Sequence, residues 1–390
     1  MNKIYFYLIF LWIITGCKEK YDSPVITPET GYLVVEGAIN SGQGITDITL
    51  SRTTKLDSRK TVFELGASVR VEADDNTFNV LTEKTAGHYI ANNLNLNTQK
   101  KYRLNIKTKA GKEYLSDFLT IKNNPPIDSI YWQRETNGVQ LYVNTHDSEG
   151  NTRYYLWEFT ETWEHPADFK SYLKYEVITG GQRGNTYKVV YRDPNNNNYF
   201  DSSMYFCWQS QVSTQILIGT SVKLSKDEIN LPLTFIPSTS AKLNALYSIQ
   251  VKQKSLTKEA FEFLEIMKKN SEMTGTIFDA QPAVLYGNIH GVTDPNEPVI
   301  GYLSICPIQE KRIFIDHKQV PNWDYNSNCK ETMFSNNSNT IRDKSLGFMP
   351  TNVVPLLAPF PTIVSFFAAP PECVDCRLSG TNVKPSFWPN

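Results

Sequence analysis

The sequence predicts a mainly β protein with two β-sandwich domains, an immunoglobulin- or transthyretin-like sandwich followed by a larger fibronectin III-like one. Three observations lead to this class. Apolar and polar residues alternate with period two in many short stretches that are separated by turn-forming residues. Aromatic residues make up 12% of the chain, a composition that favours strands. Only one stretch, near residues 258–271, has the spacing of an amphipathic helix.

Residues 1–16 predict a lipoprotein signal peptide. Lys3 supplies a positive start, and an apolar run from Ile4 to Ile14 is followed by two small residues and Cys17. This run is too short to span a hydrocarbon core of about 30 Å, because a helix rises about 1.5 Å per residue. We therefore expect cleavage before Cys17 and acylation of its thiol, for example by palmitate, which would attach the chain to a lipid bilayer. The alternative is an ordinary secretory signal with a chance cysteine.

Residues 17–30 predict a flexible tether between this anchor and the folded part. The segment from Lys18 to Pro28 is polar, contains prolines and has no apolar period. Its charged start either bears on export to the cell surface or is simply a solvated spacer, and the sequence leaves both interpretations open.

Residues 31–123 predict a compact N-terminal β-sandwich. Alternating patterns indicate strands at residues 32–37, 68–72, 77–81, 102–107 and 113–115. Strands with one apolar and one polar face form two packed sheets. The sequence Asn-Asn-Pro-Pro at 123–126 then interrupts regular structure, since proline lacks a backbone N–H and forces the preceding residue into an extended conformation. We place a domain boundary there.

Residues 127–390 predict a larger β-rich domain with insertions and a disulfide-stabilised tail. Strand patterns occur at residues 127–132, 139–145, 153–163, 204–209, 215–218, 246–252, 284–289, 299–305 and 312–315. Residues 165–203 are expected to be irregular. The tail from residue 322 onward contains many prolines and is expected to be loop-like.

The predicted helix has recognisable ends and an apolar face. Thr257 can accept a hydrogen bond at the amino end, Glu259 suits the positive end of the helix dipole, and Lys268 with Lys269 suits the negative end. Its apolar residues indicate that the helix packs on a sheet.

One strand is unusually aromatic. Tyr155, Trp157 and Phe159 alternate and so share one face of the strand at 153–163. Such a face usually belongs to a core, and the alternative is a platform on which a carbohydrate stacks.

Five cysteines follow Cys17, and disulfides are expected among them because the chain is predicted to be exported. Cys373 and Cys376 have the spacing of a redox dithiol but follow two prolines, and no paired histidines complete a zinc site. We predict that Cys329 bonds one member of this pair. Cys207 is either a buried thiol or the partner of the other member.

A weak calcium signal lies in the polar loop at residues 193–204. Asp193, Asn195, Asn197 and Asp201 alternate like the ligands of a calcium loop, but the glycine and the glutamate that such a loop needs are missing. A solvated turn is the simpler interpretation, and no cofactor or metal is expected.

Composition and motifs restrict the function classes. The chain has 39 basic and 40 acidic residues without a basic run, which argues against nucleic acid as a partner. No phosphate-binding glycine loop, zinc-protease motif or nucleophile elbow is present. We therefore expect a protein that is not an enzyme, although a hydrolase assembled from distant residues stays open.

Several short stretches match the pattern of a known family: residues 373–377, 380–385, 387–388, 207–208, 287–289, 301–302 and 125–130. By these stretches the chain resembles the domain-of-unknown-function 4249 family of Bacteroidetes outer-membrane lipoproteins. Cys306 departs from the family pattern, which implies that it is the unpaired thiol. The first domain also looks like carboxypeptidase-regulatory and transthyretin-like modules, an analogy of fold alone.

This resemblance implies an outer-membrane lipoprotein whose gene tends to lie near a TonB-dependent receptor. We therefore expect a lipid-anchored, surface-facing accessory subunit of a TonB-dependent nutrient-uptake system. The alternative is a surface module that binds glycan or peptide on its own.

Overall fold

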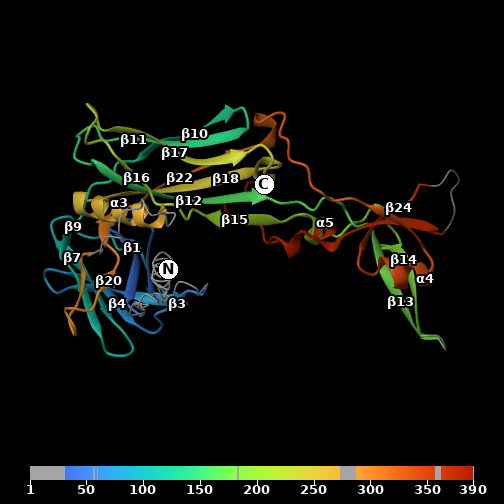
Figure 1. The fold of residues 1–390 in the computed structure, drawn as a ribbon, viewed down its shortest axis with the longest axis horizontal. Coiled ribbons are helices and arrows are strands. Elements are labelled where there is room, and N and C mark those ends of the chain that lie inside the picture. Colours follow the sequence, from blue (N-terminus) through green and yellow to red (C-terminus); the bar gives the residue numbers. More distant parts are fainter. Residues whose placement is uncertain are drawn as a thin grey trace, which may run out of the picture.

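The computed structural model describes residues 31–55, 58, 60–181, 184–272, 287–355 and 362–389. The predicted signal peptide, Cys17 and the tether lie outside these residues. Strands make up 46% of the structure and helices 12%, so the predicted mainly β class is confirmed. Figure 1 shows two β-rich bodies side by side, here called the first and second sandwich, and a small distal module at the far end of the molecule.

The first sandwich is built around strands with alternating burial. Its sheets have the order β19-β8-β7-β4-β5-β6-β2-β1-β20, and β5 joins them because it pairs with both β4 and β6. Side chains such as Leu50, Val69 and Leu104 are completely buried between the sheets. The strands are β1 (Leu33–Asn40), β2 (Ile45–Arg52), β3 (Val62–Phe63), β4 (Ser68–Ala73), β5 (Phe78–Thr85), β6 (His88–Asn92), β7 (Lys101–Lys107), β8 (Glu113–Ser116), β9 (Leu119–Thr120), β19 (Ile289–Gly291), β20 (Val299–Ile300) and β21 (Ser304–Cys306).

Three of these strands correct the domain division expected from the sequence. From the sequence, residues 127–390 were all expected to belong to the second domain. Instead, β19 pairs with β8, and β20 and β21 lie parallel to β1. Ile289, Leu303 and Ile305 are buried in the core of the first sandwich. Pairing between strands that are far apart in the chain leaves no local trace in the sequence. Residues beyond the boundary near residue 123 therefore return to the first sandwich without a signal that predicts it.

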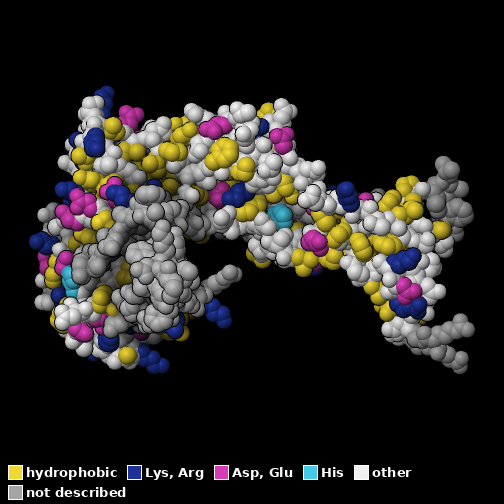
Figure 2. Space-filling model, in the orientation of Figure 1, with side chains coloured by type: hydrophobic (Ala, Val, Ile, Leu, Met, Phe, Trp, Pro, Cys, Tyr) yellow, Lys and Arg dark blue, Asp and Glu magenta, His cyan; other side chains and the backbone are white. Residues whose placement is uncertain are grey.

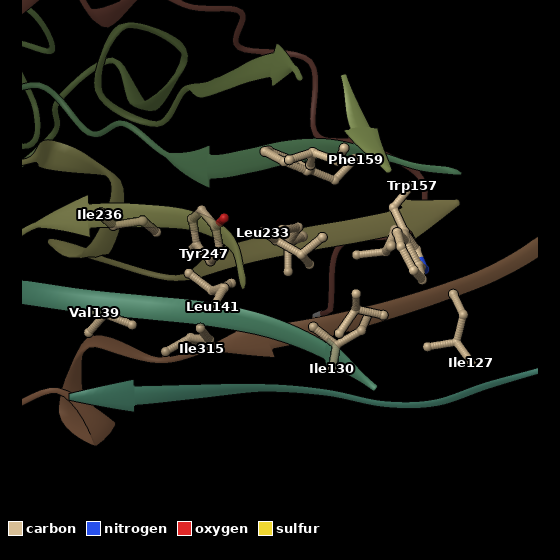
Figure 3. Close-up of a cluster of buried hydrophobic side chains, with 14 of the residues drawn as sticks. Ile127, Ile130, Val139, Leu141, Trp157, Phe159, Leu233, Ile236, Tyr247 and Ile315 are labelled. Carbon is tan, nitrogen blue, oxygen red and sulfur yellow. The ribbon is translucent and has the colours of Figure 1, made fainter. Parts of the chain in front are cut away.

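The second sandwich has a sheet of three strands facing a sheet of five. The smaller sheet has the order β10-β11-β17, and the larger has β15-β12-β18-β22 with β16 also paired to β12. Figure 3 shows how side chains of both sheets meet in one core. The strands are β10 (Ile127–Glu135), β11 (Gly138–His146), β12 (Tyr154–Glu164), β15 (Trp208–Val212), β16 (Leu217–Thr220), β17 (Glu228–Pro237), β18 (Tyr247–Ser255) and β22 (Gln309–Ile315).

Helix α3 (Lys258–Glu272) packs on the larger sheet of the second sandwich, as its apolar face predicted. The Ala260 N–H donates to Thr257 Oγ1 at 3.1 Å, which is the expected cap. Phe261 contacts Tyr154 of β12, with ring centres 5.1 Å apart, and the buried Phe263 contacts Tyr302, with ring centres 5.6 Å apart. The helix therefore touches both sandwiches.

The distal module is the largest departure from the sequence analysis. Residues 165–203 and the tail after residue 322 were expected to lack regular structure, but together they form a hairpin and a three-stranded sheet around a small core. Leu173, Val189 and Phe366 are almost completely buried there. The core is shared between these two segments, which are more than a hundred residues apart in the chain, so neither segment alone indicates it. The strands are β13 (Leu173–Gly181), β14 (Gly184–Tyr191), β23 (Thr332–Ser335), β24 (Met349–Val353) and β25 (Ser365–Ala369).

Short helical turns complete the structure. Among the described helices, none has the length and apolar character needed to cross a bilayer. The turns are α2 (Ser202–Tyr205), α4 (Ser338–Thr340), α5 (Pro371–Val374), η1 (Ala241–Leu243), η2 (His317–Gln319), η3 (Ile341–Ser345) and η4 (Cys376–Leu378).

Candidate binding site at the neck

A narrow neck, formed by residues 164–172, 205–208 and 369–381, connects the second sandwich to the distal module (Figure 1). Backbone hydrogen bonds connect these segments. The His165 N–H donates to the Cys207 carbonyl at 2.8 Å, and the Phe169 N–H donates to the Cys373 carbonyl at 3.1 Å. The neck is thus an ordered connection between two cores.

Two disulfides cross the neck. Cys207 bonds Cys376 and Cys329 bonds Cys373, so all four candidate cysteines of the sequence analysis are paired. Cys306 is a free, buried thiol of the first sandwich, and burial raises its pKa. Disulfides form and persist in oxidising compartments, which places this chain outside the cytoplasm.

Hydrogen bonds from two arginine side chains stabilise the same region. Asp375 caps η4 by accepting from the Arg377 N–H, and the Arg377 guanidinium donates two further bonds to its carboxylate, at 2.8 and 2.7 Å. These bonds hold the pKa of Asp375 below its usual value. Arg192 of the distal side donates to the Ser171 hydroxyl and carbonyl, at 2.9 Å for the shortest bond to each.

A pocket of about 400 Å³, here called the neck pocket, opens where the neck meets the distal module. Lys170 lies on its wall with the ammonium 4.6 Å from the ring centre of Phe200 and 5.1 Å from that of Tyr205. The rings hold the cation in place, and within the described residues its N–H donors have no hydrogen-bond acceptor. The other lining residues are Asp168, Phe169, Tyr172, Glu331, Asn352, Val353, Pro355 and Phe367.

Asp168 lies beside one of the disulfides. Its carboxylate and the sulfurs of Cys329 and Cys373 lie within 4.8 Å of one another. The two sulfurs are bonded to each other, so they are not available as thiolate ligands. This is the one such group of potential metal ligands in the part of the chain that the structure describes.

A second pocket of about 400 Å³, the edge pocket, lies beside strand β15. Trp163, residues 208–211 and residues 379–381 of the tail line it. Because Trp208 pairs with Glu164, the Trp208 side chain lies on the opposite face of the sheet from Trp163. On that face Trp388 packs edge-on against Trp208 and donates its indole N–H to Glu164 at 2.9 Å.

Ser379, which lines the edge pocket, contacts His165, and such a pair could in principle be catalytic. The Ser379 Oγ and the His165 Nε2 are 2.8 Å apart. Among the described residues, however, no carboxylate is hydrogen-bonded to His165, and burial lowers its pKa. The N–H of Gly380, which follows the serine, already donates to the Cys376 carbonyl at 2.9 Å. The pair therefore lacks both an orienting acid and a backbone oxyanion hole.

The calcium candidates have local roles in the structure. Asp193 accepts from the Asn195 N–H at 2.8 Å within a turn that continues through Asn197. Asp201 caps α2 by accepting from the Ser203 N–H and hydroxyl, which lowers its pKa. The predicted strand at 204–209 consequently begins only at Trp208.

The aromatic face of β12 is core. Tyr155 and Trp157 are fully buried and Phe159 is 6% exposed, so they offer no carbohydrate platform. The exposed rings of Tyr199 and Phe206 were not predicted from the sequence. Lys170 and Glu331 were not predicted either, because the two segments that carry these residues meet only in the folded chain. The spacing of Cys329 and Cys373 was the available signal that these segments come together.

Comparisons with known proteins give a family and little else. The model of the family described as "Domain of unknown function (DUF4249)" matches residues 18–312. No curated protein matches the sequence. One matching solved chain comes from the work described as "Complete structure of manganese lipoxygenase of Gaeumannomyces graminis and partial structure of zonadhesin of Komagataella pastoris". It shares 10% identity, covers 59% of this chain and 90% of that chain, and has a TM-score of 0.14, too low to support an inference.

Proposed function

This chain belongs to the DUF4249 family, a family of unknown function, and from that premise we propose that it is an outer-membrane lipoprotein acting as a non-enzymatic accessory subunit of a TonB-dependent nutrient-uptake system. Cys17 is its lipid anchor, and a TonB-dependent barrel is its main partner. The paired cysteines support export to an oxidising compartment.

The observation that carries the proposal is the apolar surface of the distal module. Val177 and Ile178 of β13 are 47% and 49% exposed, and Met333 of β23 is 61% exposed. Leu346 and Val364 add to the same module, and Figure 2 shows hydrophobic side chains over its visible face. Apolar side chains that gather at one end of a molecule are typical of a protein–protein contact.

The construction of the neck supports this role. Two disulfides and the backbone ladder connect the distal module firmly to the second sandwich. The contact surface is therefore presented in a fixed orientation, which reduces the entropy lost on docking. A barrel anchored in the same membrane would meet this surface at a high effective concentration.

Purification of the native acylated protein from detergent-solubilised outer membranes tests the proposal. Mass spectrometry should find acyl chains on Cys17 and a TonB-dependent barrel in stoichiometric amount. A Val177→Asp, Ile178→Asp double variant should lose the barrel. Val62→Asp is the matched control, because Val62 is equally exposed, at 49%, but lies on the first sandwich. Recovery of the lipoprotein alone, or an unmodified Cys17, would contradict the proposal.

The alternative is a surface module that binds glycan or peptide by itself, and the neck pocket favours it. Lys170, Glu331 and Tyr172 combine charge and aromatic surface in one concavity. Binding of an array ligand that is lost in Lys170→Ala, together with recovery of the protein without a barrel, would select this alternative.

A further inference from the structure

Strand β15 has an open edge. On one side its residues 208–212 pair with residues 160–164 of β12. On the other side one bridge is made, in which the Trp208 N–H donates to the Thr381 carbonyl at 2.8 Å and the Thr381 N–H donates back at 3.0 Å. The tail thus pairs with the first residue of the edge and no further within the described residues.

The backbone groups beyond this bridge point away from β12. Residues of an antiparallel strand direct their N–H and C=O groups alternately to one side and the other. Since Trp208 directs its groups outward, Ser210 and Val212 do the same. Ser210, Gln211 and Val212 are exposed, Val212 by 62%, and the structure gives the outward groups no backbone partner in the residues it describes.

This edge lacks the usual protection against pairing. Edge strands of soluble proteins commonly carry a charged residue or a proline, or are interrupted by a bulge. The sequence of β15, Trp-Gln-Ser-Gln-Val, has no charged residue and no proline, and its register with β12 is continuous. An unprotected edge is suited to strand addition.

The adjoining edge pocket supplies a second, independent observation. Trp163 lines this pocket, and its buried indole N–H has no acceptor within the described residues. Trp163 is only 8% exposed. Leaving a buried donor unpaired costs about 1–3 kcal/mol, so a bound group that accepts from this indole would gain from the contact.

We propose that the open edge of β15 binds an extended peptide segment of another protein by strand addition, with a side chain of that segment in the edge pocket beside Trp163. The N–H groups of Ser210 and Val212 donate to carbonyls of the peptide, and their carbonyls accept from its N–H groups. The outward groups recur every second residue, about 6.8 Å apart, which is the repeat of an extended peptide and favours it over a glycan. This inference stands apart from the lipid anchor and from the contact at the distal module.

Selection from a displayed library of random dodecapeptides against the full mature chain tests the proposal, followed by fluorescence anisotropy with the enriched peptides. Ser210→Pro removes the outward N–H and leaves the backbone bonds to β12 in place, so the Kd should rise at least tenfold; its loss of the hydroxyl contact with Thr162 is shared by the Ser210→Ala control. Ser210→Ala keeps the backbone donor and should stay within twofold of the parent. Trp163→Phe, which removes the unpaired indole donor of the edge pocket, should also weaken binding.

Hydrogen exchange of the unaltered protein gives a test without any variant. Addition of an enriched peptide should protect the amides of Ser210 and Val212, whereas the amide of Gln211, which faces β12, should not change. The proposal is overturned if no peptide is enriched, if the Ser210 and Val212 amides gain no protection, or if folded Ser210→Pro binds as tightly as the parent. Binding of array glycans that Ser210→Pro leaves unchanged would assign the pocket to carbohydrate and also overturn it.

Discussion

The side-chain amide of Asn124 donates to the backbone carbonyl of Gln253 at 2.7 Å, inside the junction between the two sandwiches. The same amide donates to the Pro307 carbonyl at 2.8 Å. The Gln253 side chain in turn donates to the Pro125 carbonyl and accepts from the Trp157 indole, both at 2.8 Å. The segment expected to be a simple domain boundary is therefore held by a buried network.

Loss of this network should destabilise the protein. Gln253→Ala removes partners from the Trp157 indole and the Pro125 carbonyl, and both groups stay buried. We expect the free energy of unfolding to fall by about 2–4 kcal/mol, because each buried group left unpaired costs about 1–3 kcal/mol. Urea unfolding checks this, with the exposed Gln43→Ala as the control. Equal stability of the two variants would show that the network contributes nothing.

The two disulfides should contribute unequally. Their sequence separations are 169 residues for Cys207–Cys376 and 44 residues for Cys329–Cys373. Loop entropy predicts about 5 kcal/mol for the longer loop and about 4 kcal/mol for the shorter one. Double alanine variants of each pair, compared by guanidinium unfolding, should rank in this order. Loss of either disulfide should also make the neck more sensitive to limited proteolysis. An uncleaved neck in both variants would show that the disulfides do not stabilise it.

A buried ion pair in the second sandwich should matter more than an exposed one. Lys242 Nζ lies 2.6 Å from the carboxylate of Glu161, which also accepts from the Tyr247 hydroxyl at 2.9 Å. Glu161→Gln leaves Lys242 without its counter-charge and should cost about 3 kcal/mol. Glu176→Gln, in the exposed pair of Glu176 and Lys188, should cost less than about 1 kcal/mol. Denaturant unfolding of both variants checks the contrast, and similar costs would refute it.

The pKa values of two histidines should be shifted in opposite directions from the ordinary value. Asp128 lies 2.7 Å from His146 Nδ1 and raises the pKa of that histidine, whereas burial lowers the pKa of His165 despite the nearby Asp168. Proton NMR titration should place His146 above the ordinary value of about 6.5 and His165 below it. Asp128→Asn should return His146 toward that value. Identical titration of the two histidines would contradict both assignments.

These pKa shifts determine how each histidine makes the stability of the fold depend on pH. His146 contributes stability that is fully present below its unfolded pKa and is lost as pH rises through its raised folded pKa. His165 contributes stability that is present above its unfolded pKa and is lost as pH falls toward its lowered folded pKa. Measurement of unfolding between pH 5 and 8 in the His165→Asn variant should show a weaker loss at the acidic end than in the parent.

Local sequence patterns predicted many of the β-strands. Strands β4, β7 and β11 lie where alternation predicted them, because one face of each is buried and the other meets solvent. Thr257 and the apolar residues that follow it were sufficient to predict α3, since capping and helical spacing are local properties. The aromatic run of β12 was correctly interpreted as core.

The sequence by itself determined the β class, the helix and the cysteines that are available for pairing, all of which depend on residues that are near one another in the chain. Only the tertiary structure decided that residues 289–306 complete the first sandwich and that the distal module has its own core. It also decided that β15 has an open edge beside the pocket that Trp163 lines. These features arise from contacts between segments that are far apart in the chain, and a periodic pattern that indicates a strand does not indicate which distant strand it pairs with.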